Sequence, residues 1–382
     1  MVGRSTTRAS TKRSSRSRPP QAKGYSVGTM NAKRFSQAFG GIVDNVETVI
    51  KGKTDVIRLA LTAMLCEGHI LFEDVPGTGK TMLARALAQS MHATNARVQC
   101  TPDMLPADIT GSSIYDQRKT KFEFMAGPVF VNVLLADEVN RATPKTQSAL
   151  LEAMGERKVS ADGVTHLLPR PFFVLATQNP VELAGTFPLP EAQLDRFLFK
   201  LSMGYMDRDS EYEVMFDNQV QLAIEDLGAV VNTATITQMI AYTTTVNLSP
   251  EVAYYIIDLI QATRDDPALS LGASPRASIA LLRASRALAA SDGRTDVYPD
   301  DVREVLRPIL AHRIMLNPDA MLRGETVDAV IERVVSRVKP PATGGPSRSR
   351  TSASSSGDGE TSAPTRRATR RGRSKAKAGV RR

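Results

Sequence analysis

The sequence predicts an α/β fold with a parallel sheet, followed by an all-helical domain. Short apolar runs, typical of buried strands, alternate with segments whose apolar residues recur at helical spacing. A glycine-rich loop also separates the first of these strands from the helix after it. Beyond residue 204 the strand signals stop, and six segments have helical spacing: 208–222, 233–243, 250–264, 275–290, 299–312 and 325–338.

Each element of the sheet region rests on its own pattern. The segment 42–66 has apolar spacing compatible with two helices interrupted at Lys51-Gly52. Four apolar runs predict buried strands: HILFEDV (69–75), VFVNVLLADEV (129–139), RPFFVLATQNP (170–180) and FLFKLSM (197–203). Helical spacing recurs in KTMLARALAQSM (80–91) and TPKTQSALLEAMGE (143–156).

Two further segments interrupt this alternation and predict hairpins. The segment 111–130 alternates in polarity and turns at Arg118-Lys119. The segment 157–169 turns at Asp162-Gly163, which is a strong hairpin signal.

Composition divides the chain into four expected parts: a tail over 1–34, an α/β domain over 35–204, a helical domain over 205–338 and a tail over 339–382. The tails are rich in Ser, Thr, Arg, Lys, Gly and Pro, so burial cannot offset the entropy of ordering, and we predict disorder. Their net charges are +9 and +10, whereas the whole chain carries +9, which leaves an acidic body of −10. The tails could attract nucleic acid or another polyanion, or serve as solvated linkers without a specific partner.

The stretch EDVPGTGKT (73–81) resembles a phosphate-binding loop, although the pattern G-x-x-x-x-G-K-[ST] requires glycine where Asp74 stands. The order strand, glycine loop, helix supports the motif, and an acidic side chain near the strand end can point away from the phosphates. Gly77 and Gly79 allow backbone N–H groups to approach phosphate closely. The residues expected to cradle a nucleoside triphosphate are Val75, Pro76, Gly77, Thr78, Gly79, Lys80, Thr81 and Met82.

The chemistry expected here is Mg²⁺-assisted phosphoryl transfer. Lys80 would contact the β- and γ-phosphates, and the Thr81 hydroxyl together with Asp137 would hold Mg²⁺. Glu138 could orient and polarise the attacking water. These groups fall at the carboxyl ends of parallel strands, where ligands bind in such sheets.

Three other residues have both a functional and a structural interpretation. Asn179 could bond the γ-phosphate or the water, or form a turn before Pro180. Arg276 would follow an N-cap at Ser274, where a cation opposes the helix dipole unless an anion is near, and a solvated arginine is the alternative. Arg196 could pair with a local acid such as Asp195, or reach a neighbouring subunit's γ-phosphate as an arginine finger.

Five motifs in fixed order, LFEDVPGTGKT, LLADEVNRA, VLATQNP, LPEAQLDRF and GASPRA, resemble those of the MoxR family of AAA+ ATPases over about residues 36–338. Loops of the EDVPG type are usual in that family. The resemblance implies Walker A at Lys80 and Thr81, Walker B at Asp137 and Glu138, and ATP with Mg²⁺ as cofactors. It further implies that Asn179 is sensor 1, Arg196 the arginine finger and Arg276 sensor 2.

The resemblance also implies an assembly and a role. An arginine finger that acts on the nucleotide of a neighbouring subunit requires a ring of subunits, which is expected to be a hexamer. The two hairpins are similar to the helix-2 insert and the pre-sensor-1 hairpin, which project toward the ring axis or face. Members of the family are thought to act as chaperone-like remodellers of client proteins, often with a partner that carries a von Willebrand factor A domain. Lys53 departs from the family pattern, in which a glutamine often follows the glycine that corresponds to Gly52 here.

Alternative functions differ in what they require. A nucleic-acid motor would account for the basic tails, but the acidic body argues against a basic channel. A magnesium-chelatase-like motor subunit would require its chelatase partners, and a small-molecule kinase fits the paired arginines and helical lid less well.

There is no secretory signal and no apolar run of membrane-spanning length. Two cysteines, Cys66 and Cys100, fit a reducing compartment, and we expect a cytoplasmic protein.

Overall fold

The computed structural model describes residues 30–74, 77–179, 185–205, 208, 211–212, 224 and 226–342. All of these residues belong to one compact unit. Most of the two predicted tails lies outside the described residues. The boundary of the first tail at residue 34 is nevertheless wrong, because helix α1 (Ala32–Glu47) begins inside it and is capped by the Asn31 side chain.

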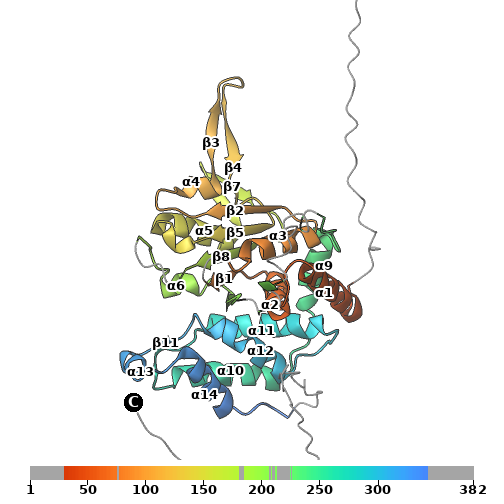
Figure 1. Ribbon diagram of the computed structural model, residues 1–382, viewed down its shortest axis with the longest axis vertical. Coiled ribbons are helices and arrows are strands. Elements are labelled where there is room, and N and C mark those ends of the chain that lie inside the picture. Colours follow the sequence, from red (N-terminus) through yellow and green to blue (C-terminus); the bar gives the residue numbers. More distant parts are fainter. Residues whose placement is uncertain are drawn as a thin grey trace, which may run out of the picture. The chain divides into compact units, whose positions relative to one another are not determined.

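A five-stranded parallel sheet forms the centre of the fold, as predicted (Figure 1). Its strand order is β2-β5-β8-β1-β9. The predicted strands correspond to β1, β5, β8 and β9, whereas β2 was not predicted, because its exposed edge residues break the apolar run. The bounds are β1 (Ile70–Glu73), β2 (Asn95–Gln99), β5 (Val133–Asp137), β8 (Phe173–Gln178) and β9 (Phe199–Leu201).

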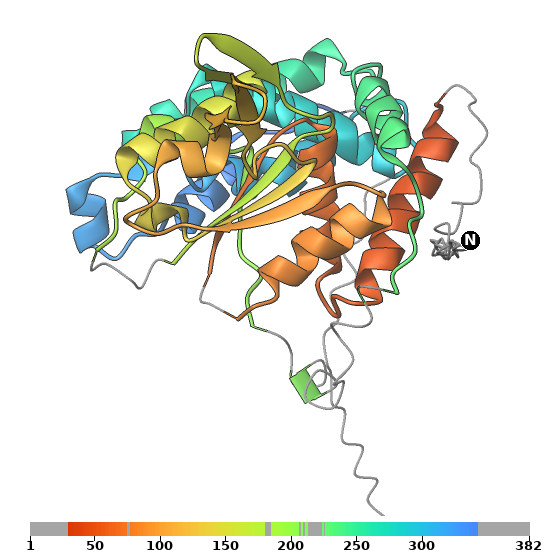
Figure 2. The ribbon, with the colours of Figure 1, turned by 90° about the horizontal axis from the view of Figure 1, so that it is seen from above.

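Helices cover both faces of this sheet. Successive residues of β1 point to opposite faces, so Ile70 and Phe72 join one core cluster and Leu71 joins the other. The first cluster contains α1, α2 (Thr54–Leu65) and α3 (Lys80–Ser90), and the second contains α5 (Pro144–Glu156). Figure 2 shows these helices around the sheet from above. A short helix, α4 (Pro106–Thr110), precedes the first hairpin.

Both predicted hairpins are present. Strands β3 (Gly111–Asp116) and β4 (Lys121–Ala126) pair antiparallel, as do β6 (Lys158–Ala161) and β7 (Val164–Leu167). Figure 1 shows the β3–β4 hairpin extending well beyond the sheet. The ring of Phe124 in β4 stacks on that of His166 in β7 at 3.9 Å, which joins the two hairpins at their bases.

The region after residue 226 is helical, as predicted, and its helices share the core cluster of α1 to α3. Most of the helix predicted over 208–222 lies outside the described residues. The prediction that the region has no strands is wrong, since β10 and β11 form a two-stranded sheet whose strands are too short for a sequence pattern. The bounds are α9 (Thr233–Thr243), α10 (Pro250–Arg264), β10 (Leu269–Leu271), α11 (Pro275–Ser291), α12 (Pro299–Leu310), β11 (Met315–Leu316), α13 (Pro318–Leu322) and α14 (Val327–Arg337).

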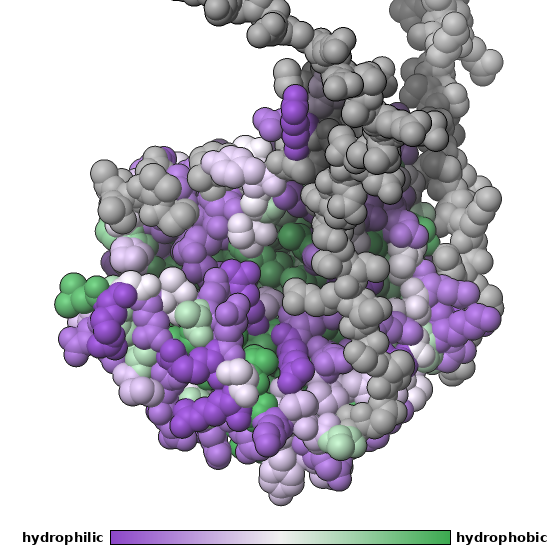
Figure 3. Space-filling model, turned by 60° about the horizontal axis from the view of Figure 1, so that its bottom comes forward, coloured by the Kyte–Doolittle hydropathy of each residue, from purple (hydrophilic) through white to green (hydrophobic). Residues whose placement is uncertain are grey.

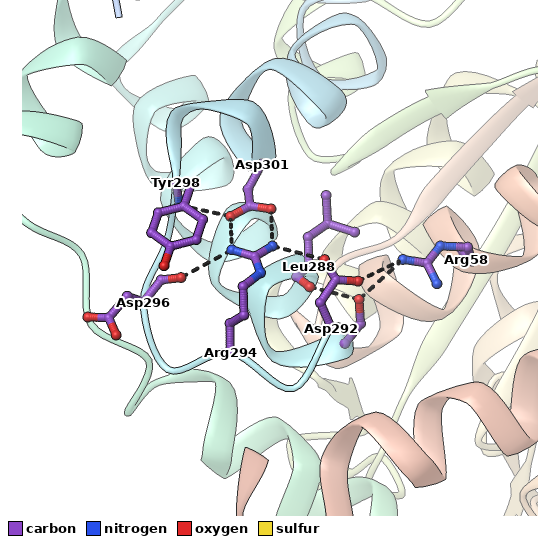
Figure 4. Close-up of polar contacts among 8 residues, drawn as sticks. Arg58, Leu288, Asp292, Arg294, Asp296, Tyr298 and Asp301 are labelled. Atoms are coloured by element: carbon purple, nitrogen blue, oxygen red, sulfur yellow. Dashed lines mark hydrogen bonds and ion pairs between the residues drawn. The ribbon is translucent and has the colours of Figure 1, made fainter. Parts of the chain in front are cut away.

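A polar network joins the helical region to α2 (Figure 4). The guanidinium of Arg294 forms two bonds of 2.5 and 2.7 Å to the buried carboxylate of Asp301, and one of 2.9 Å to Asp292. Asp292 in turn pairs with Arg58 of α2 at 3.4 Å. The turn between α11 and α12 is therefore fixed to the sheet domain.

The view in Figure 3 shows a largely hydrophilic surface with smaller apolar patches. Within the described ranges, no helix has both the length and the apolar character needed to cross a membrane.

His69, immediately before β1, gives the fold a predicted pH dependence. Its Nδ1 accepts a bond from the Val174 N–H, so Nε2 donates to the Met154 carbonyl, both at 3.1 Å. Burial, with a smaller effect from nearby Arg157, lowers the pKa of His69 from 6.5 to about 4. Below pH 6.5 the unfolded chain binds a proton that the folded chain excludes, so stability is complete above pH 6.5 and is lost as pH falls. We expect this group to lower the free energy of unfolding by about 3 kcal/mol between pH 6.5 and 4.

The measurement is urea denaturation of the wild type and of His69→Gln across that range. The variant should lose less stability than the wild type on acidification, whatever its stability at neutral pH. His92→Asn, which replaces an exposed histidine, is the control. Equal losses for wild type and His69→Gln would show that His69 is not the responsible group.

Candidate nucleotide site and arginine pair

The glycine loop lies between β1, which ends at Glu73, and α3, which begins at Lys80. Gly77 and Gly79 have φ angles of +84° and +89°, in the region that favours glycine. A Cβ at either position would meet no atom within 4 Å, so the backbone conformation, rather than space, requires glycine there. Gly79 is the N-cap of α3, so the loop leads directly to a helix N-terminus, where backbone N–H groups favour an anion. Val75 and Pro76 lie outside the described residues.

Asp74 does not face the cradle. Its carboxylate accepts bonds of 2.6 Å from the Ser202 hydroxyl, 2.6 Å from the Met203 N–H and 3.3 Å from the Gly204 N–H. It is 9% exposed. The carboxylate therefore anchors the segment after β9 to the base of the glycine loop, which explains an acidic residue where the general motif has glycine.

Lys80 is buried at the first position of α3, with Nζ 3.1 Å from the Thr78 hydroxyl. Burial lowers the pKa of its ammonium, while the carboxylates of Asp74 and Asp137 oppose that shift. The side chain thus lies near both the loop and the carboxylates of the sheet edge. Thr81 and Met82 follow it in the first turn of α3.

Thr177 organises the two predicted acids. Its hydroxyl donates to the Asp137 carboxylate at 2.6 Å and accepts from the Glu138 N–H at 2.9 Å. Glu138 has left-handed backbone angles of φ 54° and ψ 49°, an uncommon conformation for glutamate that turns the chain sharply after β5. Sequence reasoning missed Thr177, although it is the polar residue that ends the buried part of β8.

Two arginines pair with these acids and were also missed. Arg97 of β2 contacts the Asp137 carboxylate at 2.7 Å, and Arg141 contacts that of Glu138 at 3.2 Å. Arg141 belongs to the 3-10 helix η1 (Val139–Arg141). The alternation of exposed and more buried residues along β2 was the available signal, but β2 itself was not recognised.

Asn179 directly follows β8, at the sheet edge where Glu73 and Gln178 pair across strands. The structure therefore places Asn179 at the edge to which β5 contributes Asp137. Oxygen ligands from a hydroxyl and a carboxylate suit Mg²⁺, which commonly takes one or two protein ligands and completes its shell with phosphate and water. Thr81 and Asp137 fit that requirement, and the described part of the chain contains no group of three or more His, Cys, Asp or Glu side chains that could hold a metal ion.

Arg196 and Arg276 have their contacts on elements other than the glycine loop. Arg196, after α6 (Glu191–Leu194), donates to the Leu151 carbonyl at 2.9 Å, whereas Arg276 pairs with Asp195 at 3.5 Å and is 67% exposed. The possible pairing of Arg196 with Asp195 is therefore wrong, because Asp195 faces the helical region instead. Ser274 and Pro275 begin α11 as predicted. Among the contacts of the described residues, neither arginine meets Lys80 or the Walker-type acids.

Comparisons with known proteins agree with this geometry. The family model for the ATPase family associated with various cellular activities (AAA) matches residues 69–199, and the AAA lid domain matches residues 261–334. The chaperone MoxR1 of Mycobacterium tuberculosis is 39% identical over 78% of this chain and 80% of its own, and the protein YeaC of Bacillus subtilis is 47% identical over 79% and 94%. A crystal structure from Cytophaga hutchinsonii is 39% identical with a TM-score of 0.76, covering 81% of this chain and 96% of that one. The chain belongs to the MoxR family of AAA+ ATPases.

Proposed function

We propose that this protein hydrolyses ATP with Mg²⁺ in a ring of identical subunits, expected to be a hexamer, and uses the energy to remodel partner proteins. One observation carries the proposal: Thr177 aligns Asp137 and Glu138 at the sheet edge that the glycine loop and Lys80 also occupy. The name of the relative MoxR1, a chaperone, supports the remodelling role.

Each residue has a defined part in this proposal. The amides of the loop and the Lys80 ammonium bind the β- and γ-phosphates, and Thr81 and Asp137 hold Mg²⁺, which neutralises developing charge. Glu138 takes the proton of the attacking water, and its Thr177-bound N–H keeps its backbone in place. Asn179 orients the water or the γ-phosphate.

The two arginines serve the neighbouring subunit. Arg196 and Arg276 are both exposed at the surface. Arg196 contacts α5 and Arg276 contacts Asp195 in the turn before β9, and among the contacts of the described residues neither meets the phosphate loop of its own chain. Exposed guanidinium groups on such a surface are suited to a phosphate that arrives with another subunit. We propose that Arg196 is the finger and that Arg276 assists it as sensor 2.

Mixing subunits tests the trans assignment. Arg196→Ala should lower hydrolysis by about 10³-fold, because arginine fingers contribute 10³–10⁵ in rate. Mixed with Lys80→Ala subunits, whose own pockets are dead, it should regain activity, since a Lys80→Ala neighbour supplies an intact Arg196. The control partner is Lys80→Ala/Arg196→Ala, which cannot supply the finger. Equal activity with both partners would mean that the finger does not act in trans.

The protein partner is proposed from the family resemblance. We expect a cytoplasmic protein with a von Willebrand factor A domain to bind the ATP state of the ring and to direct it to a client. The test is binding of such a purified domain to the Glu138→Gln ring in ATP, with Lys80→Ala as the nucleotide-free control. Equal binding to both rings would exclude a nucleotide-dependent partnership.

The basic tails favour a second candidate, contact with nucleic acid or another polyanion. A chain of residues 30–342 lacks both tails and retains every described element. Stimulation of its ATPase by DNA would favour a nucleic-acid motor, whereas stimulation of the full chain alone would assign the contact to the tails.

A further inference from the structure

A buried arginine of the helical region holds the turn that carries Arg196. Arg313, between α12 and β11, has a side chain that is only 4% exposed. Its Nε donates to the Asp195 carboxylate at 2.7 Å, and its two other nitrogens donate to four carbonyl oxygens, those of Asp195, Phe197, Leu198 and Ile309, at 2.6–3.3 Å. These five bonds equal the number of N–H groups that a guanidinium possesses. Three of the four carbonyls belong to the turn between α6 and β9.

The residue before Arg313 adds another bond to the same turn. His312 is buried, and its Nε2 lies 3.0 Å from the Phe197 carbonyl oxygen. That carbonyl therefore receives bonds from both members of the His312–Arg313 pair. Arg196 stands between two residues whose carbonyls are held, so its backbone cannot move independently of the helical region.

Asp195 connects Arg313 to Arg276. One carboxylate oxygen bonds Arg313, while the other lies 3.5 Å from the Arg276 guanidinium and 3.4 Å from the Ser274 hydroxyl at the start of α11. Of the two cations on this carboxylate, one is buried with a short bond and the other is exposed with a long one. Arg276 can therefore leave for a phosphate while Arg313 keeps Asp195 in place.

The other end of β9, away from this turn, lies next to the base of the subunit's own glycine loop. β9 contains three residues, and the segment directly after it is bonded by Asp74 at the base of the glycine loop. Arg313 thus holds one end of β9 and Asp74 the other. One short strand therefore links the turn that bears Arg196 to the base of the glycine loop, and Arg313 links that turn to the helical region.

We infer that Arg313 is a positioning residue for hydrolysis in the adjacent subunit: through the turn carbonyls and Asp195 it places Arg196, and the carboxylate that Arg276 contacts, relative to the helical region. The inference rests on the proposed function in one respect, that Arg196 acts in trans. It adds a residue that touches no nucleotide and yet sets the rate at the neighbour's site.

Arg313→Lys keeps the charge but loses the planar fork that serves several acceptors at once. We expect kcat to fall by about 10- to 100-fold, because small misplacements of a catalytic group have effects of that size. The Kd for ATP and ring assembly should stay unchanged, since the variant's own phosphate loop is intact. Arg333→Lys is the matched control, because Arg333 also forms two 2.9 Å bonds to a buried carboxylate, that of Asp266, remote in sequence from the turn.

Mixing separates positioning from a general structural role. Arg313→Lys subunits mixed with Lys80→Ala subunits should regain activity, because the intact pocket of the first receives correctly placed arginines from the second. Asp195→Asn, which preserves volume and the backbone carbonyls, should behave likewise and covers the case in which Arg313→Lys does not fold. Wild-type kcat in both variants, no rescue by mixing, or loss of ring assembly in both would overturn the inference. Failure of the Arg196→Ala mixture would instead reject the trans finger itself.

Discussion

Replacing Lys80 with alanine is expected to abolish ATP binding and, with it, hydrolysis. The ammonium lies at the first residue of α3 beside the glycine loop and is largely buried; burial lowers its pKa, and the carboxylates of Asp74 and Asp137 oppose that shift. A charge-assisted contact of that kind to phosphate contributes about 1.5–3 kcal/mol, which corresponds to roughly 10- to 100-fold in affinity. Removal also leaves the loop with excess negative charge from the nearby acids, so the loss should exceed that range.

The measurement is the Kd of a fluorescent ATP analogue together with steady-state hydrolysis. The variant should fold normally, because Asp74 keeps its three partners at the end of β9 and does not depend on Lys80 for them. Lys33→Ala, at an exposed position of α1, is the control for loss of a lysine elsewhere. Wild-type affinity in Lys80→Ala would place the phosphates outside this loop and remove the basis of the proposed function.

The sequence was informative about the sheet where strands are buried on both faces. β1, β5 and β8 are continuous apolar runs, and each run ends close to a polar residue of the candidate site. β2 has only two apolar residues, Ala96 and Val98, because it is an edge strand, so no run was visible. Because β2 was not predicted, Arg97 was not recognised as a site residue. Its contact with Asp137 follows from the pairing of β2 with β5.

The contacts that position the site were beyond the reach of local patterns. Thr177 meets Asp137 across 40 residues, and Arg313 meets Asp195 across 118. Motif spacing names residue types at strand ends, but it does not tell which neighbour a side chain selects once the strands are in register. Arg196 illustrates the limit: a carboxylate stands beside it in sequence, yet its guanidinium turns to the Leu151 carbonyl while a distant arginine takes the carboxylate.

The position of Glu138 makes its replacement by glutamine a sharp test of the chemistry. Its backbone is fixed by the bond from its N–H to Thr177 and by its left-handed conformation, neither of which involves the carboxylate. Glutamine has the same length and can still contact a water, but it cannot take a proton. General-base catalysis contributes about 10²–10⁴ in rate, so Glu138→Gln should hydrolyse ATP at least 100-fold more slowly.

Binding should survive, because Lys80, the loop amides and Asp137 are unchanged, and the ring should retain ATP through gel filtration. The measurements are single-turnover hydrolysis and the nucleotide content of the eluted ring. Glu152→Gln, at an exposed position of α5, is the control. Hydrolysis at the wild-type rate would assign proton removal to another group. Loss of binding together with hydrolysis would instead mean that the carboxylate, which pairs with Arg141 at 3.2 Å, maintains the shape of the pocket rather than its chemistry.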